Sequence, residues 1–209
     1  GIDNSRYDWA VGAYEQIFNI TPDWANTGFA VINCESGCAR DDDNYLCISS
    51  TYELKNFLED IVKPMSKDSP WEEDNQIHTP PTVWTEDFSY SLAGVPGMVT
   101  KKTSGHFNLN TYHSNRDLQE DHYSEEHYLY SHILYSTILY ELDKANVIPL
   151  DFTTRLEALI EDIAETCPKG AELTSATEDV LETARSVKEK IAKINSGNLS
   201  KRRTRIINN

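Results

Sequence analysis

The amino-acid sequence predicts an α/β fold: a partial, mainly parallel sheet flanked by helices and followed by C-terminal helices. Short apolar runs with β-branched residues, at 28–33 and 45–49, alternate with stretches whose apolar residues recur every three or four positions. After residue 152 only the helical pattern continues. Strands that alternate with helices are typical of a parallel sheet, because each parallel connection needs a crossover.

In the first half of the chain, glycine and proline residues mark where the expected helices and strands begin and end. In order they are a helix at about 6–20, a buried strand at 28–33, a strand at 45–49, an amphipathic helix that begins after Thr51 and ends before Pro64, an acidic loop region at 64–82, a short helix at 88–92, and a turn and strand at 94–99.

The second half is expected to be mostly helical after a polar loop at 101–115. A long helix is predicted at 124–146, and its apolar residues cover nearly all of its sides, so we expect it to be well buried against the sheet. Two further helices are predicted at about 153–165 and 175–195.

Composition excludes some classes of function. The chain has 209 residues, of which 39% are hydrophobic, enough for a real core. Its 34 acidic against 19 basic residues give a formal net charge of -15, which repels nucleic acid and anionic lipid. We therefore expect no nucleic-acid partner. No apolar run reaches the roughly 18 to 20 residues that span a bilayer, and the first residues do not resemble a signal peptide, so the compartment stays open.

Two places combine residue types that could carry chemistry. Glu35 follows the predicted strand at 28–33, where functional residues of an α/β sheet collect, although a surface turn glutamate is the simpler alternative. Tyr112, His113 and Asp117 lie together in a polar loop before the long helix. An imidazole, a phenol and a carboxylate suit metal binding and stabilisation of an oxyanion, yet a single histidine is more often structural or solvated.

Several motifs resemble the C-terminal half of the M28 family of zinc peptidases, and more closely its glutamate carboxypeptidase II and transferrin receptor branch. The resemblance covers roughly residues 7–152. The motifs that carry it are the acidic residues and Phe at 86–88, Gly94-Val95-Pro96, Tyr112-His113-Ser114 with Asp117, the Ile148-Pro149-Leu150-Asp151-Phe152 segment, and Val31-Ile32-Asn33-Cys34-Glu35-Ser36.

The resemblance implies a role for each matching residue. His113 would be a ligand of one zinc ion, and Glu35, where the family usually has Asp, a ligand of the other. Tyr112 would stabilise the oxyanion, and Asp117 would support its loop. It also implies two domains: 1–152 as the C-terminal portion of a peptidase domain and 153–209 as the start of a helical dimerisation domain.

The family's remaining ligands and its general base belong to segments upstream of the strand that carries Glu35, and no such segment is present before it. We therefore expect this chain to be the C-terminal portion of a zinc-dependent exopeptidase, an aminopeptidase or carboxypeptidase acting on peptides. Its two-zinc site would be incomplete, and the chain alone inactive. The alternative is a non-catalytic binding or dimerisation module with the same fold, and a homodimer is a possible partner in either case.

Overall fold

The computed structural model describes residues 10–35, 44–101, 110–167 and 170–197. The chain forms two compact units. Of the described residues, the first unit contains those before 52 and those at 58–139, and the second contains 52–57 and those after 139. The predicted domain division at residue 152 refers to the resemblance and stays a prediction.

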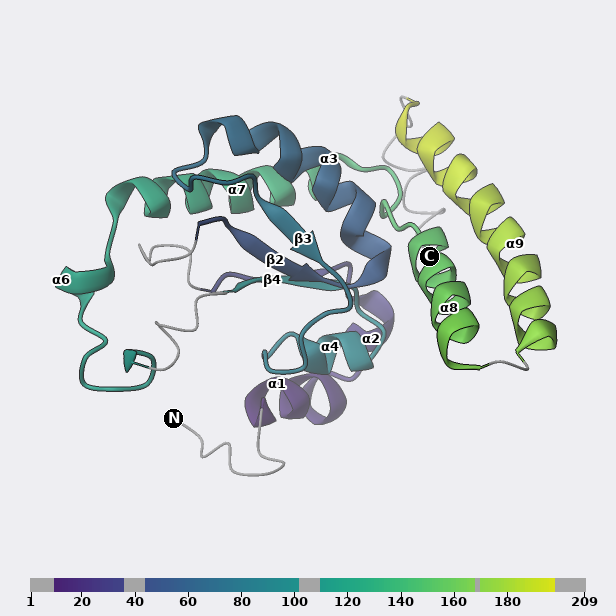
Figure 1. Cartoon of the computed structure of the whole chain (residues 1–209), viewed down its shortest axis with the longest axis horizontal. Helices are drawn as coiled ribbons and strands as arrows, with labels where there is room; N and C mark the ends of the chain where they lie inside the picture. The colour runs from purple at the N-terminus through teal and green to yellow at the C-terminus, as the bar shows by residue number, and fades with distance from the viewer. Residues whose placement is uncertain (1–9, 36–43, 102–109, 168–169, 198–209) are drawn as a thin grey trace. The chain divides into compact units, whose positions relative to one another are not determined.

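A four-stranded sheet forms the centre of the first unit (Figure 1). Its strands, in the order β1-β4-β2-β3, are β1 (Val31–Asn33), β4 (Gly97–Lys101), β2 (Cys47–Ser50) and β3 (Gln76–His78). The pairings of β1 with β4 and of β2 with β3 are parallel, and the central pairing of β2 with β4 is antiparallel. The predicted α/β class with a mainly parallel sheet is confirmed.

Helices cover both faces of this sheet (Figure 1). On one face lie α3 (Lys55–Met65) and α7 (Glu125–Lys144), and on the other lie α1 (Val11–Glu15), α2 (Trp24–Thr27) and α4 (Phe88–Leu92). A π-helical turn (Gln16–Ile20) extends α1, and the short helix α6 (Gln119–His122) precedes α7. The core consists of apolar side chains from the sheet and from the face of α3 and α7: Ile48, Leu58, Val62, Met98, Val99, Leu134 and Ile138.

Three expectations about these elements were wrong. Strand β3 lies in the region expected to be a loop, because its sequence, Gln-Ile-His, has one apolar residue and no strand pattern. Helix α3 runs past Pro64 to Met65 and continues as a 3₁₀ turn (Ser66–Asp68). A proline in the last turn removes a single intrahelical hydrogen bond, which is a smaller disturbance than in the middle of a helix.

The third correction concerns α7, which is not buried on all sides. Leu134 and Ile138 are fully buried, whereas Leu129 and Ile133 are 52% and 59% exposed. A helix beside a sheet buries one stripe only, so the apolar residues of the opposite face remain in contact with solvent.

The second unit contains a 3₁₀ turn (Tyr52–Leu54) and the helices α8 (Thr153–Thr166) and α9 (Ala171–Asn195), which lie side by side (Figure 1). Both helices were predicted, although α9 begins four residues earlier than expected. None of the helices in the described ranges combines the length and the apolar content needed to cross a bilayer.

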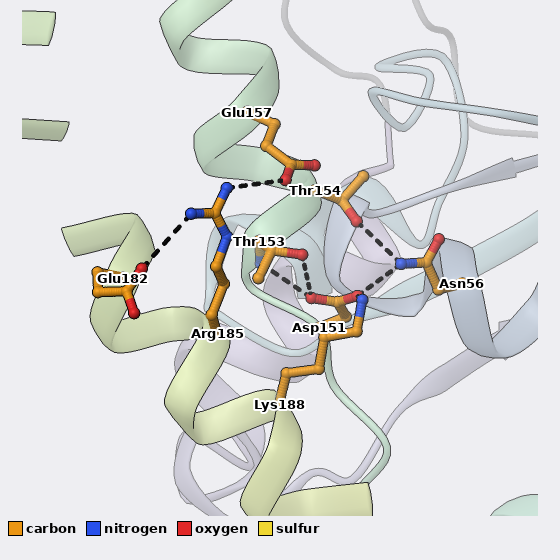
Figure 2. A network of polar contacts seen from close by, with 8 residues as sticks. All are labelled: Asn56, Asp151, Thr153, Thr154, Glu157, Glu182, Arg185 and Lys188. Atoms are coloured by element: carbon orange, nitrogen blue, oxygen red, sulfur yellow. Dashed lines mark hydrogen bonds and ion pairs between the residues drawn. The ribbon is translucent and has the colours of Figure 1, made fainter. Parts of the chain in front are cut away.

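Asp151 organises this second unit (Figure 2). Its Oδ1 accepts hydrogen bonds from the backbone N–H of Thr153 (3.0 Å) and from the hydroxyl of Thr153 (2.6 Å), and so satisfies one of the free N–H groups at the start of α8. Its Oδ2 accepts one from the Asn56 amide (2.5 Å) and pairs with Lys188 of α9 (2.6 Å). One carboxylate thus ties together the segment at 52–57, the start of α8 and the middle of α9.

Candidate functional site

Glu35 lies two residues beyond the carboxyl end of β1, as expected, and its backbone is held from two sides. The carbonyl oxygen of Glu35 accepts a hydrogen bond from the hydroxyl of Thr100, in β4, and another from that of Tyr135, in α7, at 3.2 Å. Thr100 is 1% exposed, so this anchor is fixed in the core. The position of Glu35 therefore depends on the neighbouring strand and on the long helix, and not only on its own turn.

The Glu35 side chain belongs to a group of carboxyl groups. The Asn33 amide donates to Oε1 of Glu35 (2.9 Å) and to Oδ1 of Asp87 (3.2 Å), and so holds the two carboxyls together. The carboxyl of Glu35 is also hydrogen-bonded to that of Glu86. We call Asn33, Glu35, Glu86 and Asp87 the acidic cluster. Two of its members come from the end of β1 and two from the turn that leads into α4.

The cluster changes the protonation of Glu35. The pKa of Glu35 is raised from 4.5 to about 7, first by burial and then by the hydrogen bond to Glu86. The hydrogen bond from Asn33 lowers this pKa, and the charges of Glu86 and Asp87 raise it. Two hydrogen-bonded carboxyls share a proton, because like charges at that distance cannot both remain ionised without compensation. Binding of a cation or of a second proton would therefore stabilise the cluster.

The need of the cluster for a cation or a further proton is clearest at Asp87. It is only 2% exposed, and its Oδ2 is buried without a hydrogen-bond partner in the described part of the chain. Burying a carboxylate oxygen without a partner is costly, so such atoms usually face a ligand, an ion or water.

Tyr112 lies near this cluster, although it comes from a distant loop. The Tyr112 side chain is 46% exposed, yet its partial burial raises the pKa of the phenol, and the negative charges of Glu35, Glu86 and Asp117 raise it further. The loop follows β4, the parallel neighbour of β1, and the carboxyl ends of parallel neighbours lie at the same edge of a sheet. The pairing of β1 with β4 thus explains how the carboxyl of Glu35 can act on a phenol that lies so far away in the sequence.

His113 has an unusual backbone in the same loop. Its φ is +58°, in the left-handed region that few residues other than glycine adopt, and its ring stacks on that of Tyr112 with centroids 3.8 Å apart. Such backbone conformations concentrate at functional sites. Both side chains are exposed, and so is that of Asp117.

The site as described has too few donors to enclose a metal ion. Within the described residues, no group of three or more His, Cys, Asp or Glu side chains is arranged to hold one. The carboxylate of Glu35 and the imidazole of His113 are donor types that zinc accepts, but a zinc ion needs three or four protein ligands. The donor chemistry thus fits zinc while the number of donors does not.

Sequence reasoning assigned no role to Glu86, Asp87, Asn33, Thr100 or Tyr135. The acidic pair was noticed only as part of a motif, because two acids before a short helix usually form a solvated first turn. The position of the pair in the sequence could have indicated its role, because it directly precedes Phe88 and lies upstream of a Gly-Val-Pro turn that leads into a strand. The hydrogen bonds of Glu86 to Glu35 and of Asp87 to Asn33 show that the pair faces the end of β1.

Comparison with known proteins adds no identification. No protein-family model matches the chain, and no match is found among curated proteins. The resemblance to zinc peptidases therefore stays a prediction.

Proposed function

We propose that this chain is the C-terminal portion of a zinc-dependent exopeptidase of the M28 type and that it contributes one side of a two-zinc site. The observation that supports this proposal best is that the charges of Glu35 and Glu86 act on the phenol of Tyr112, while Asn33 joins Glu35 to the buried carboxyl of Asp87. A carboxylate and an imidazole are groups that can bind zinc, and a phenol can stabilise the oxyanion that forms when a peptide bond is hydrolysed.

In this proposal each side chain has a separate task. Glu35 and His113 would hold zinc ions, which when bound activate water and polarise a carbonyl group. The Tyr112 phenol has a raised pKa, so it keeps its proton at neutral pH and can donate a hydrogen bond to the oxygen that gains charge during attack. Asp117 adds negative charge near the phenol and so helps to keep it protonated.

The anchors of Glu35 explain how such a site would stay in place. Thr100 and Tyr135 hold the backbone of Glu35, and Asn33 orients its carboxyl. Supporting hydrogen bonds of this kind fix the direction of a metal-binding side chain and its basicity. The remaining ligands and the general base would come from residues outside this chain, and we expect the 209-residue chain alone to be inactive.

A non-catalytic binding or dimerisation module is the second candidate, and the exposed apolar side chains of the second unit favour it. Leu159 of α8 and Leu173 and Val180 of α9 are 43%, 55% and 54% exposed. Apolar residues on the outer face of a helical pair are suited to contact a second copy. This candidate predicts a dimer whose formation does not require Glu35, Tyr112 or His113.

Zinc titration of the chain tests the first candidate. We expect weak binding, measured by competition with a chromophoric chelator, that falls about tenfold in His113→Ala and in Glu35→Ala. His132→Ala removes an exposed histidine from α7 and serves as the control, with no change expected. Equal affinities in all four proteins would contradict the assignment of Glu35 and His113. Tight stoichiometric zinc would contradict an incomplete site.

A further inference from the structure

Tyr112 and His113 are the two central residues of a tight turn. The carbonyl oxygen of Thr111 accepts hydrogen bonds from the backbone N–H of Ser114 (3.1 Å) and from the hydroxyl of Ser114 (2.6 Å), and these two bonds close the turn. Thr111 is only 8% exposed, so one end of the turn is held in a buried position. The side chains of both central residues are exposed.

The rings of Tyr112 and His113 stack on each other although the two residues are neighbours in the sequence. Their centroids are 3.8 Å apart and their planes differ by 21°. Neighbouring side chains of an extended chain point to opposite sides, so such a stack requires a bend between them. The φ of +58° at His113 provides this bend, in a backbone region that residues other than glycine seldom adopt.

Stacking leaves the imidazole able to bind a metal ion. The lone pair of an imidazole nitrogen lies in the plane of the ring, so a partner over the ring face does not block it. A histidine that binds zinc is usually oriented by a hydrogen bond from its other nitrogen to a carboxylate or carbonyl group. The His113 ring makes no such hydrogen bond to the residues that the structure describes, and the contact that orients it there is the Tyr112 ring.

We propose that Tyr112 is a positioning residue for His113: its ring fixes the plane of the imidazole and so prepares a nitrogen for zinc. This role needs the ring alone, whereas the proposed contact with the oxyanion needs the hydroxyl. An imidazole without a stacking partner would lose rotational freedom when it binds zinc, and the stack removes part of that freedom beforehand. The inference rests on the proposed role of His113 as a zinc ligand.

Two substitutions separate the ring of Tyr112 from its hydroxyl. Tyr112→Phe keeps a stacked ring, and Tyr112→Leu replaces the ring by an aliphatic side chain. In zinc titrations of the full 209-residue chain, we expect Tyr112→Leu to weaken zinc binding about threefold to fivefold and Tyr112→Phe to bind zinc as the parent does.

A second pair of exposed aromatic rings supplies the matched control. Tyr128 and His132 lie on α7 with ring centroids 4.2 Å apart, and neither belongs to the proposed zinc site. Tyr128→Leu therefore removes a tyrosine ring from beside a histidine and should leave the zinc affinity unchanged.

Nuclear magnetic resonance detects the stack in the absence of zinc. An aromatic ring shifts the resonances of protons that lie over its face. The ring protons of His113, assigned with His113→Ala, should therefore move toward their ordinary chemical shifts in Tyr112→Leu and stay in place in Tyr112→Phe. Unchanged His113 resonances in Tyr112→Leu would overturn the inference.

The zinc titrations also distinguish failure of this inference from failure of the proposed function. Equal zinc affinities of Tyr112→Leu and the parent, with weaker binding in His113→Ala, would overturn the positioning role alone. Equal losses in Tyr112→Phe and Tyr112→Leu would also overturn it, because the hydroxyl would then be responsible. An unchanged affinity in His113→Ala would refute the proposed zinc ligand, and the positioning role with it.

Discussion

At the scale of single residues, the main finding is that Glu35 is held by its neighbours more than by its own turn. The turn after a strand would leave a glutamate side chain in solvent, where its pKa would stay near the ordinary value. Contacts from Asn33, Thr100 and Tyr135 instead draw it toward Glu86 and Asp87. The position and the raised pKa of Glu35 are therefore produced largely by residues far away in the sequence.

The raised pKa of Glu35 predicts how stability depends on pH. Its folded pKa of about 7 exceeds the ordinary value of 4.5, so the folded state binds more protons between these values, and stability falls as pH rises through that window. Glu35→Gln imitates the protonated carboxyl. We expect this substitution to raise the free energy of unfolding by about 1 kcal/mol at pH 8 and to leave it almost unchanged near pH 4.5. The expected gain is small because the side chain is half-exposed and solvent screens its charge.

Urea unfolding of both proteins at several pH values measures this difference. Glu178→Gln, at an exposed position of α9, is the matched control and should show no such pH dependence. A constant difference between Glu35→Gln and the parent from pH 4.5 to pH 8 would disprove the pKa shift.

At the scale of elements, helix α7 shows how a sequence pattern can overstate burial. Its apolar residues surround the helix, but the sheet contacts only one side. The other side carries Leu129, Ile133 and Tyr140 in contact with solvent. Periodicity reports which residues could be buried, and the number of neighbouring layers decides which of them are.

A pair of identical substitutions in α7 tests this description. Ile138→Ala removes a fully buried side chain and should lower the free energy of unfolding by about 2 to 4 kcal/mol. Ile133→Ala truncates a side chain that is 59% exposed and should change it by less than about 0.5 kcal/mol. Chemical denaturation compares the two, and equal losses would show that the outer face of α7 is covered.

At the scale of the whole molecule, the chain forms two units whose members are not contiguous in sequence. In the second unit, residues 52–57 join the helices of the C-terminal region. Asp151 holds this unit together: burial would raise its pKa, but the hydrogen bonds from Lys188, Thr153 and Asn56 lower it below 3.8. The stability that these contacts provide is present above the ordinary pKa and is lost as pH falls through the folded value.

Removing this carboxylate should therefore be costly at neutral pH and less so in acid. We expect Asp151→Ala to lower the free energy of unfolding by about 2 to 3 kcal/mol at pH 7, and by a smaller amount below pH 3.8. Glu182→Ala, from the exposed ion pair with Arg185 (Figure 2), should change it by less than about 0.5 kcal/mol. Similar effects for the two variants, followed by circular dichroism, would contradict a central role for Asp151.

The sequence alone was sufficient for the α/β class, the helices α4, α7 and α8, and the turn that carries Glu35, because these follow from local periodicity and from glycine and proline. It also marked the loop with Tyr112 and His113. Strand β3 and the exposed face of α7 depended on tertiary structure, as did the meeting of Glu86 and Asp87 with Glu35. Strand pairing, burial and the pKa of a carboxyl group depend on residues that are distant in the sequence. Local sequence patterns do not indicate which of these distant segments pack together.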